Sequence, residues 1–147
     1  MPGIRVIALA IIRRNESLLV FEAADRATRR KFYRPLGGGI EFGERGFEAL
    51  VREMREELGA DISISRYLGA LENLFSVDGR EGHEIVLLYE AAFTDAGLYQ
   101  MDEMEAMEDD GSRHRVTWLA LEDCRMRRAW LVPEGLLTFL DAQDALA

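Results

Sequence analysis

The sequence has a single cysteine, Cys124, and no run of eighteen apolar residues. One cysteine excludes a disulfide bond within the chain, and a membrane-spanning helix needs a longer apolar run than any found here. The start of the chain, MPGIRVIALAIIRRN, is also too short in its apolar part, and too poor in a small-residue cleavage site, for a secretory signal. We therefore expect a cytoplasmic protein that does not enter the membrane.

Basic residues are scarce relative to acidic ones, with 18 Lys and Arg against 27 Asp and Glu and a formal net charge of -9. Binding to a nucleic acid polymer or to an anionic membrane needs a basic face, so this balance argues against both partners. A small anionic substrate would need cations that are recruited locally. The two histidines, His83 and His114, lack the spacing of metal ligands, and we assign neither a role.

The length of 147 residues predicts one domain, residues 1–147, with no internal repeat or linker. Apolar and β-branched residues predict strands, beginning with a hairpin or meander formed by residues 4–12 and 18–23. The Asp78-Gly79 turn predicts a second hairpin. Further strands are expected at residues 32–34, 61–67, 69–75, 83–93 and 116–119.

Helical periodicity is clearest in residues 46–58, and Gly59 supplies the stop. Pro133 is expected to open a final helix that buries Leu136, Leu137 and Leu140. The acidic residues 95–113 lack strong periodicity and are interpreted as an exposed loop. This order of elements predicts an α/β fold, a sandwich with one helix on each side of a curved mixed β-sheet.

The predicted helix at residues 46–58 places Glu53, Glu56 and Glu57 on one face, away from its apolar side. Neighbouring carboxylates repel one another, and a hard divalent cation such as Mg²⁺ or Mn²⁺ would relieve the repulsion. The alternative is a solvated helix face held by ion pairs such as Arg52 with Glu56. Three glycines at positions 37–39, just before the helix, indicate unusual backbone geometry or a close approach.

From Gly38 the chain continues with five residues, Glu44, seven residues and the run REMREELGA, which ends at Ala60. This segment resembles the Nudix box, G-x5-E-x7-R-E-U-x-E-E-x-G-U, in which U is a bulky apolar residue. Every fixed letter is present at its spacing, and the one departure is the small Ala60, which concerns packing. The flanking hairpins and the closing helix also resemble the rest of the Nudix fold.

The resemblance implies a metal site in which Glu53, Glu56 and Glu57 bind Mg²⁺ or Mn²⁺ and carry the catalysis. It implies that the main-chain carbonyl of Gly37 joins them as a ligand. It gives the remaining box positions a structural role, namely Gly38, Glu44, Arg52 and Gly59.

The reaction implied is attack of water on a phosphorus of a diphosphate linkage in a nucleoside di- or triphosphate, a nucleotide sugar or a similar compound. In the family the general base is a box glutamate, here Glu53, or a carboxylate on a later loop. Glu105 and Glu108 are the candidates for the second choice, and a solvated acidic loop is the alternative interpretation of both.

Three further residues are candidates for substrate binding: Asn73 and Phe75 for a base or sugar, and Arg34 for a phosphate. The alternatives are a core Phe and a surface Arg. Two other functions on the same scaffold are open, an isopentenyl-diphosphate-type isomerase and a non-catalytic nucleotide-sensing module. The isomerase usually needs a well-placed cysteine, which Cys124 does not offer, and sensing modules generally lose box carboxylates, none of which is lost here. A homodimer is compatible with the sequence, which does not decide the oligomeric state.

Overall fold

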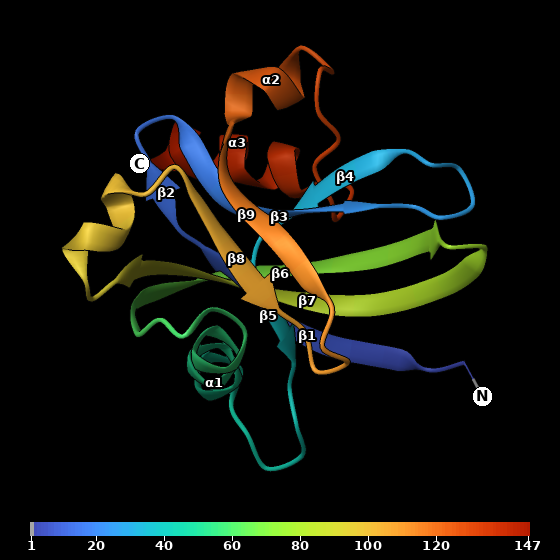
Figure 1. Ribbon diagram of the computed structural model, residues 1–147, viewed down its shortest axis with the longest axis horizontal. Helices are drawn as coiled ribbons and strands as arrows, with labels where there is room; N and C mark the ends of the chain where they lie inside the picture. The colour runs from blue at the N-terminus through green and yellow to red at the C-terminus, as the bar shows by residue number, and fades with distance from the viewer. Residues whose placement is uncertain (1) are drawn as a thin grey trace.

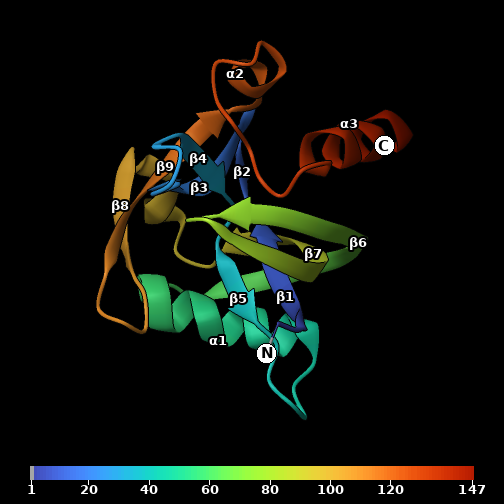
Figure 2. The same ribbon diagram turned by 90° about the vertical axis from the view of Figure 1, so that its right-hand side faces the viewer.

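The computed structural model describes residues 2–147 and contains two β-sheets that lie between α1 on one side and α2 and α3 on the other (Figures 1 and 2). One sheet has the order β5-β1-β7-β6, with strands Gly37–Gly39, Ile4–Ile11, Arg80–Phe93 and Ile62–Val77. The other has the order β2-β3-β9-β8, and β4 pairs with β3; its strands are Arg13–Arg14, Ser17–Ala24, Arg113–Ala120, Glu103–Met107 and Lys31–Arg34. The predicted α/β sandwich is confirmed, with two sheets in place of one.

Strand β1 is parallel to β7 and antiparallel to β5. It does not pair with β3, so the hairpin or meander predicted from residues 4–12 and 18–23 is correct only around its turn, where Leu19 N–H donates to the carbonyl of Ile12 at 2.9 Å. The two-residue β2, which follows β1, pairs with β3 through Arg13 with Leu18 and Arg14 with Ser17. The physical reason is that Ile7 to Ile12 are all buried, which suits a strand covered on both faces better than one strand of an exposed hairpin.

Helix α1, Gly46–Leu58, has the predicted bounds. The side chain of Glu48 accepts a hydrogen bond from the backbone N–H of Arg45 at 2.9 Å, which stabilises the first turn. At the other end Gly59 adopts a left-handed conformation with φ 66°, and its N–H donates to the carbonyl of Arg55. Leu50 and Met54 are fully buried, so the apolar side of α1 faces the sheets.

Strands β6 and β7 form the long hairpin that the Asp78-Gly79 turn predicts. Both turn residues have positive φ, 55° and 76°, as a tight two-residue turn requires. The two strands predicted at residues 61–67 and 69–75 are one strand, β6, with register shifts at Ile64/Arg66 and Tyr67/Gly69. The sequence break at Leu68 therefore marks a β-bulge and not a strand end.

Residues 95–113 are not the predicted loop, because they contain a 3₁₀ helix, η1 (Ala96–Gln100), and strand β8. In β8 only Ala106 is fully buried, so the strand leaves almost no apolar pattern in the sequence. The short helix α2 (Leu121–Arg125) was not predicted. The last helix, α3 (Leu136–Leu146), begins three residues after Pro133, with Leu136 and Leu140 buried and Leu137 half-buried.

The core has two parts, one on each side of β1. The first contains Leu50 and Met54 of α1 with inward-facing residues of both sheets. The second lies under α2 and α3 and contains Cys124, Leu136 and Leu140. Within residues 2–147, none of the helices has the length and apolar character that crossing a membrane requires.

Candidate active site

Arg52 of α1 connects the box helix to the loop that precedes it. Its guanidinium donates to both carboxylate oxygens of Glu44, at 2.8 and 2.9 Å, and to the carbonyl of Gly39 at 3.0 Å. It also donates to Glu53 at 2.8 Å and to Glu56 at 3.3 Å. These bonds lower the pKa of Glu44 to about 2, mainly through the hydrogen bonds from Arg52.

Gly38 lies directly against the carboxylate of Glu53. A Cβ atom built on Gly38 would be 2.5 Å from the carboxyl carbon of Glu53, so a larger residue would displace this side chain. Gly37, the residue before it, has φ 151°, and a Cβ there would overlap the backbone carbonyl oxygen of Ala8. The glycines of β5 thus allow the close approach that the sequence indicates.

Glu57 is the one buried carboxylate of α1. Burial raises the pKa of Glu57 to about 9, with hydrogen bonding to Glu53 and the negative charge of Glu108 acting in the same direction. The surroundings of Glu57 therefore disfavour the ionised form of its carboxyl group. A cation at this position would remove the penalty.

The three box acids fit a divalent cation in the chemistry of their donors. All are carboxylates, the ligands that Mg²⁺ and Mn²⁺ prefer, and the strain between Glu53 and Glu57 is of the kind that a cation relieves. Within residues 2–147 no group of three His, Cys, Asp or Glu side chains stands in the geometry of a formed metal site. Glu53 and Glu56 are instead turned towards Arg52.

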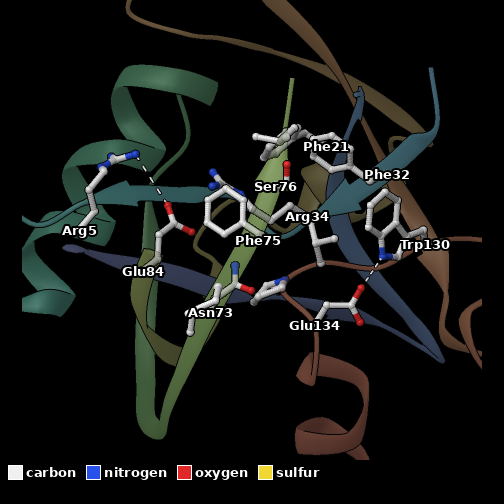
Figure 3. A pocket seen from close by; sticks show the side chains of 14 residues that line it. Arg5, Phe21, Phe32, Arg34, Asn73, Phe75, Ser76, Glu84, Trp130 and Glu134 are labelled. Carbon is white, nitrogen blue, oxygen red and sulfur yellow. Dashed lines mark hydrogen bonds and ion pairs between the residues drawn. The ribbon is translucent and has the colours of Figure 1, made fainter. Parts of the chain in front are cut away.

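A cavity of about 450 Å³ is lined by residues of β1, β3, β4, β6 and β7 and of the segment before α3 (Figure 3). Arg34 and Phe75, predicted to bind substrate, both line it, as does Asn73. Sequence reasoning did not identify Arg5, Glu84 and Trp130 as lining residues. The start of β7, Arg80 to Glu84, is polar throughout, so nothing in the sequence distinguishes Glu84 as a lining residue.

Arg34 lines this cavity, and the negative charge of Glu57 in α1 acts on its guanidinium. Its guanidinium is 4.8 Å from the ring centre of Phe21, and its Nε is buried without a hydrogen-bond partner among the described residues. Burial lowers the pKa of Arg34, while the negative charges of Glu84, Glu57 and Glu108 act against that shift. A cation on the wall of a cavity is suited to an anionic ligand.

The two downstream acids occupy different environments. Glu105 is exposed on β8 and its carboxylate accepts a hydrogen bond from Arg113 at 2.8 Å. Glu108, just after β8, is half-buried, and its charge acts on both Glu57 and Arg34. Its carboxylate is 4.0 Å from His114 Nε2. The fold thus brings Glu108 to the site and leaves Glu105 at the surface.

The chain is similar to known proteins along most of its length. The NUDIX domain family model matches residues 1–138. The CTP pyrophosphohydrolase of Escherichia coli strain K12 is 34% identical over 83 residues, which are 56% of this chain and 59% of that relative. The match thus spans about three-fifths of the curated relative.

Two solved structures have the same fold. The MutT NUDIX hydrolase of Burkholderia pseudomallei has 26% identity and a TM-score of 0.57, over 82% of this chain and 85% of that one. A NUDIX hydrolase of Nitrosomonas europaea has 16% identity and a TM-score of 0.68, over 97% and 90% of the two chains. With the match of the family model over residues 1–138, these comparisons show that the chain belongs to the Nudix family of hydrolases.

Proposed function

We propose that the protein hydrolyses a diphosphate linkage in a nucleoside triphosphate or a related nucleoside diphosphate derivative. The observation that carries the proposal is that the buried cation of Arg34 lines a cavity with aromatic walls, while the negative charge of Glu57, one of the box acids, acts on the same guanidinium. This arrangement provides a place for phosphates next to a place for a base. The E. coli relative, named as a CTP pyrophosphohydrolase, supports a nucleoside triphosphate as the first substrate to test.

The proposed cofactor is Mg²⁺ or Mn²⁺, held by Glu53, Glu56 and Glu57, with the carbonyl of Gly37 as a further ligand. When bound, the cation supplies charge neutralisation at the phosphates and makes water more acidic. Arg52 donates hydrogen bonds to Glu53 and Glu56 as well as to Glu44. These bonds limit the side-chain conformations of the two metal-binding acids.

The chain's own residues orient the substrate. Arg34 lines the cavity, and its positive charge attracts the phosphate oxygens of a substrate there. The rings of Phe75 and Trp130 line the other part of the cavity and exclude water from the face of a base. A linkage held at both ends is presented to the attacking water in a restricted geometry.

Glu108 is the proposed general base, because it alone of the two downstream acids lies near Glu57 and Arg34. A carboxylate beside the reacting phosphorus can accept the proton of the attacking water. Glu53 is the second choice, because one of its carboxylate oxygens already accepts a hydrogen bond from Arg52.

The alternative functions have less support in this geometry. The isomerase chemistry would need Cys124 near the acids of α1. Cys124 instead lies in the core under α2 and α3, whereas Leu50 and Met54 of α1 belong to the other part of the core. A sensing module does not explain why all three box acids are present.

The test is a panel of nucleoside triphosphates, nucleotide sugars, ADP-ribose and dinucleoside polyphosphates, incubated with Mg²⁺ or Mn²⁺. Released phosphate and diphosphate are measured for the wild type, for Glu57→Gln and for Glu48→Gln, a control on the same helix outside the acid cluster. We expect turnover of at least one nucleoside derivative by the wild type and by Glu48→Gln. Equal turnover by Glu57→Gln, or no turnover of any compound by the wild type, would contradict the proposal.

A further inference from the structure

A row of polar residues crosses one sheet at the floor of the cavity. Arg5 of β1 is the register partner of Glu84 in β7, and Glu84 is in turn the partner of Asn73 in β6. Direct partners in adjacent strands point to the same face of a sheet, and all three side chains line the cavity (Figure 3). The row is a product of strand register, because its members are far apart in the sequence.

Two members of this row are buried without adequate partners in the protein. Asn73 is 8% exposed and Glu84 is 6% exposed. The ionic contact of Glu84 is to Arg5 Nη1 at 3.8 Å, which is longer than a hydrogen bond. No side-chain hydrogen bond of Asn73 occurs among residues 2–147. Buried polar groups normally have partners, so these two have polar atoms available to a molecule in the cavity.

The two side chains offer a defined hydrogen-bonding pattern. An ionised carboxylate only accepts hydrogen bonds, whereas an amide both donates and accepts. Side by side, Glu84 and Asn73 match an edge that has an amine next to an unprotonated ring nitrogen. Cytosine and adenine have this edge: the amine donates to Glu84, and the ring nitrogen accepts from the amide of Asn73.

The walls around the row suit the faces of a base. Phe75 follows Asn73 by two residues on β6 and lines the same cavity, and Trp130 lines it from the segment before α3. Trp130 Nε1 donates to Glu134 at 2.9 Å, which fixes the indole ring (Figure 3). Aromatic rings stack on any base, so they contribute to affinity but not to selectivity between bases. Selectivity would come from the polar row.

We propose that Glu84 and Asn73 select a nucleotide whose base carries an amine beside an unprotonated ring nitrogen, as in cytosine and adenine. The proposal rests on the proposed function, since it assigns the base of the substrate to the cavity that Arg34 lines. Uracil is the discriminating analogue of cytosine, because it replaces the amine by a carbonyl and places a proton on the ring nitrogen. The carbonyl oxygen of uracil would face the carboxylate of Glu84 without a proton between them. Two buried acceptors cannot hydrogen-bond to each other, so uracil would bind more weakly.

The test compares cytidine and uridine nucleotides, which differ only at this edge. Binding of CMP and UMP is measured by calorimetry, and kcat/KM is measured for CTP and UTP. We expect the wild type to prefer the cytidine compound by about tenfold or more in both measurements. In Glu84→Gln the new amide donates to the uracil carbonyl, so the preference falls to near one.

The matched control is Glu90→Gln, the same change on the same strand, at a residue that pairs with Arg66 outside the cavity. It should keep the wild-type preference. Asn73→Asp removes the amide donor and should weaken CMP binding more than UMP binding.

Equal binding of CMP and UMP by the wild type, or an unchanged preference in Glu84→Gln, would overturn this assignment. Turnover of CTP and UTP at equal rates would contradict base selection by Glu84 and Asn73 while leaving the proposed hydrolase function in place. Selective CMP binding without hydrolysis of any triphosphate would support the base site and contradict the hydrolase function instead.

Discussion

Arg52 and Glu44 are joined by two parallel hydrogen bonds of 2.8 and 2.9 Å, from Nε and Nη2 to the two carboxylate oxygens. This pair closes the loop of residues 40–45 onto α1. The same guanidinium reaches Glu53 and Glu56, so the pair also determines how the box acids are held. A lysine cannot make this bidentate contact.

The Arg52–Glu44 pair makes stability depend on pH in the acid range. The pKa of Glu44 is lowered from 4.5 to about 2 in the folded protein, so its contribution is fully present above pH 4.5 and is lost as the pH falls towards 2. We expect the melting temperature of the wild type to exceed that of Glu44→Gln at pH 6, with a difference that shrinks between pH 4.5 and 2. A difference that stays constant over this range would contradict the assignment.

The buried carboxyl of Glu57 predicts the opposite dependence. Its pKa is raised from 4.5 to about 9, so the folded state binds more protons than the unfolded state and loses stability as the pH rises from 4.5 to 9. In the absence of divalent metal, Glu57→Gln should therefore be more stable than the wild type at pH 8, with a smaller gain at pH 5. Thermal unfolding in EDTA at both pH values measures this, and Glu48→Gln should show no such trend.

The general base is tested by a pair of variants that differ only in location. Glu108→Gln should lower kcat by about 10²-fold or more at saturating Mg²⁺, because it removes the proton acceptor near the site. Glu105→Gln should keep kcat close to that of the wild type, since Glu105 pairs with Arg113 at the surface. Full kcat in Glu108→Gln would transfer the role to Glu53.

The two glycines of β5 should respond differently to alanine. Gly37→Ala places a Cβ against the backbone carbonyl of Ala8 and should destabilise the fold by about 3 kcal/mol or more. Gly38→Ala meets only the end of the Glu53 side chain, so the protein should fold but turn over at least tenfold more slowly. Denaturant unfolding and kcat separate the two effects, and Gly3→Ala, which meets nothing within 4 Å, is the control. Full activity in Gly38→Ala would show that the position of Glu53 is unimportant.

The parts of the molecule that the sequence predicts well are those with local causes. Helix α1 follows from a 3.6-residue period and the stop at Gly59, and the β6–β7 hairpin follows from Asp78-Gly79. Strand β8 escapes prediction because its pairing with β9, rather than an apolar pattern, holds it in place. The same is true of the separation of β1 from β3, which depends on which sheet each strand joins.

In the site, too, residues with a local cause can be predicted and residues brought together by tertiary packing cannot. Glu53, Glu56 and Glu57 are recognisable because one helix brings them together, as the box pattern implies. The row formed by Arg5, Glu84 and Asn73 depends on the register of three strands, and no spacing in the sequence reports it. Trp130 reaches the cavity from the segment before α3, again through tertiary packing.

The central claim is that the three acids of α1 hold a divalent cation. Titration calorimetry with MgCl₂ and MnCl₂ tests it directly, on the wild type and on a variant with Glu53, Glu56 and Glu57 all changed to Gln. The account predicts saturable uptake by the wild type and none by a folded triple variant. Equal uptake by both proteins, or no uptake by the wild type, would contradict it.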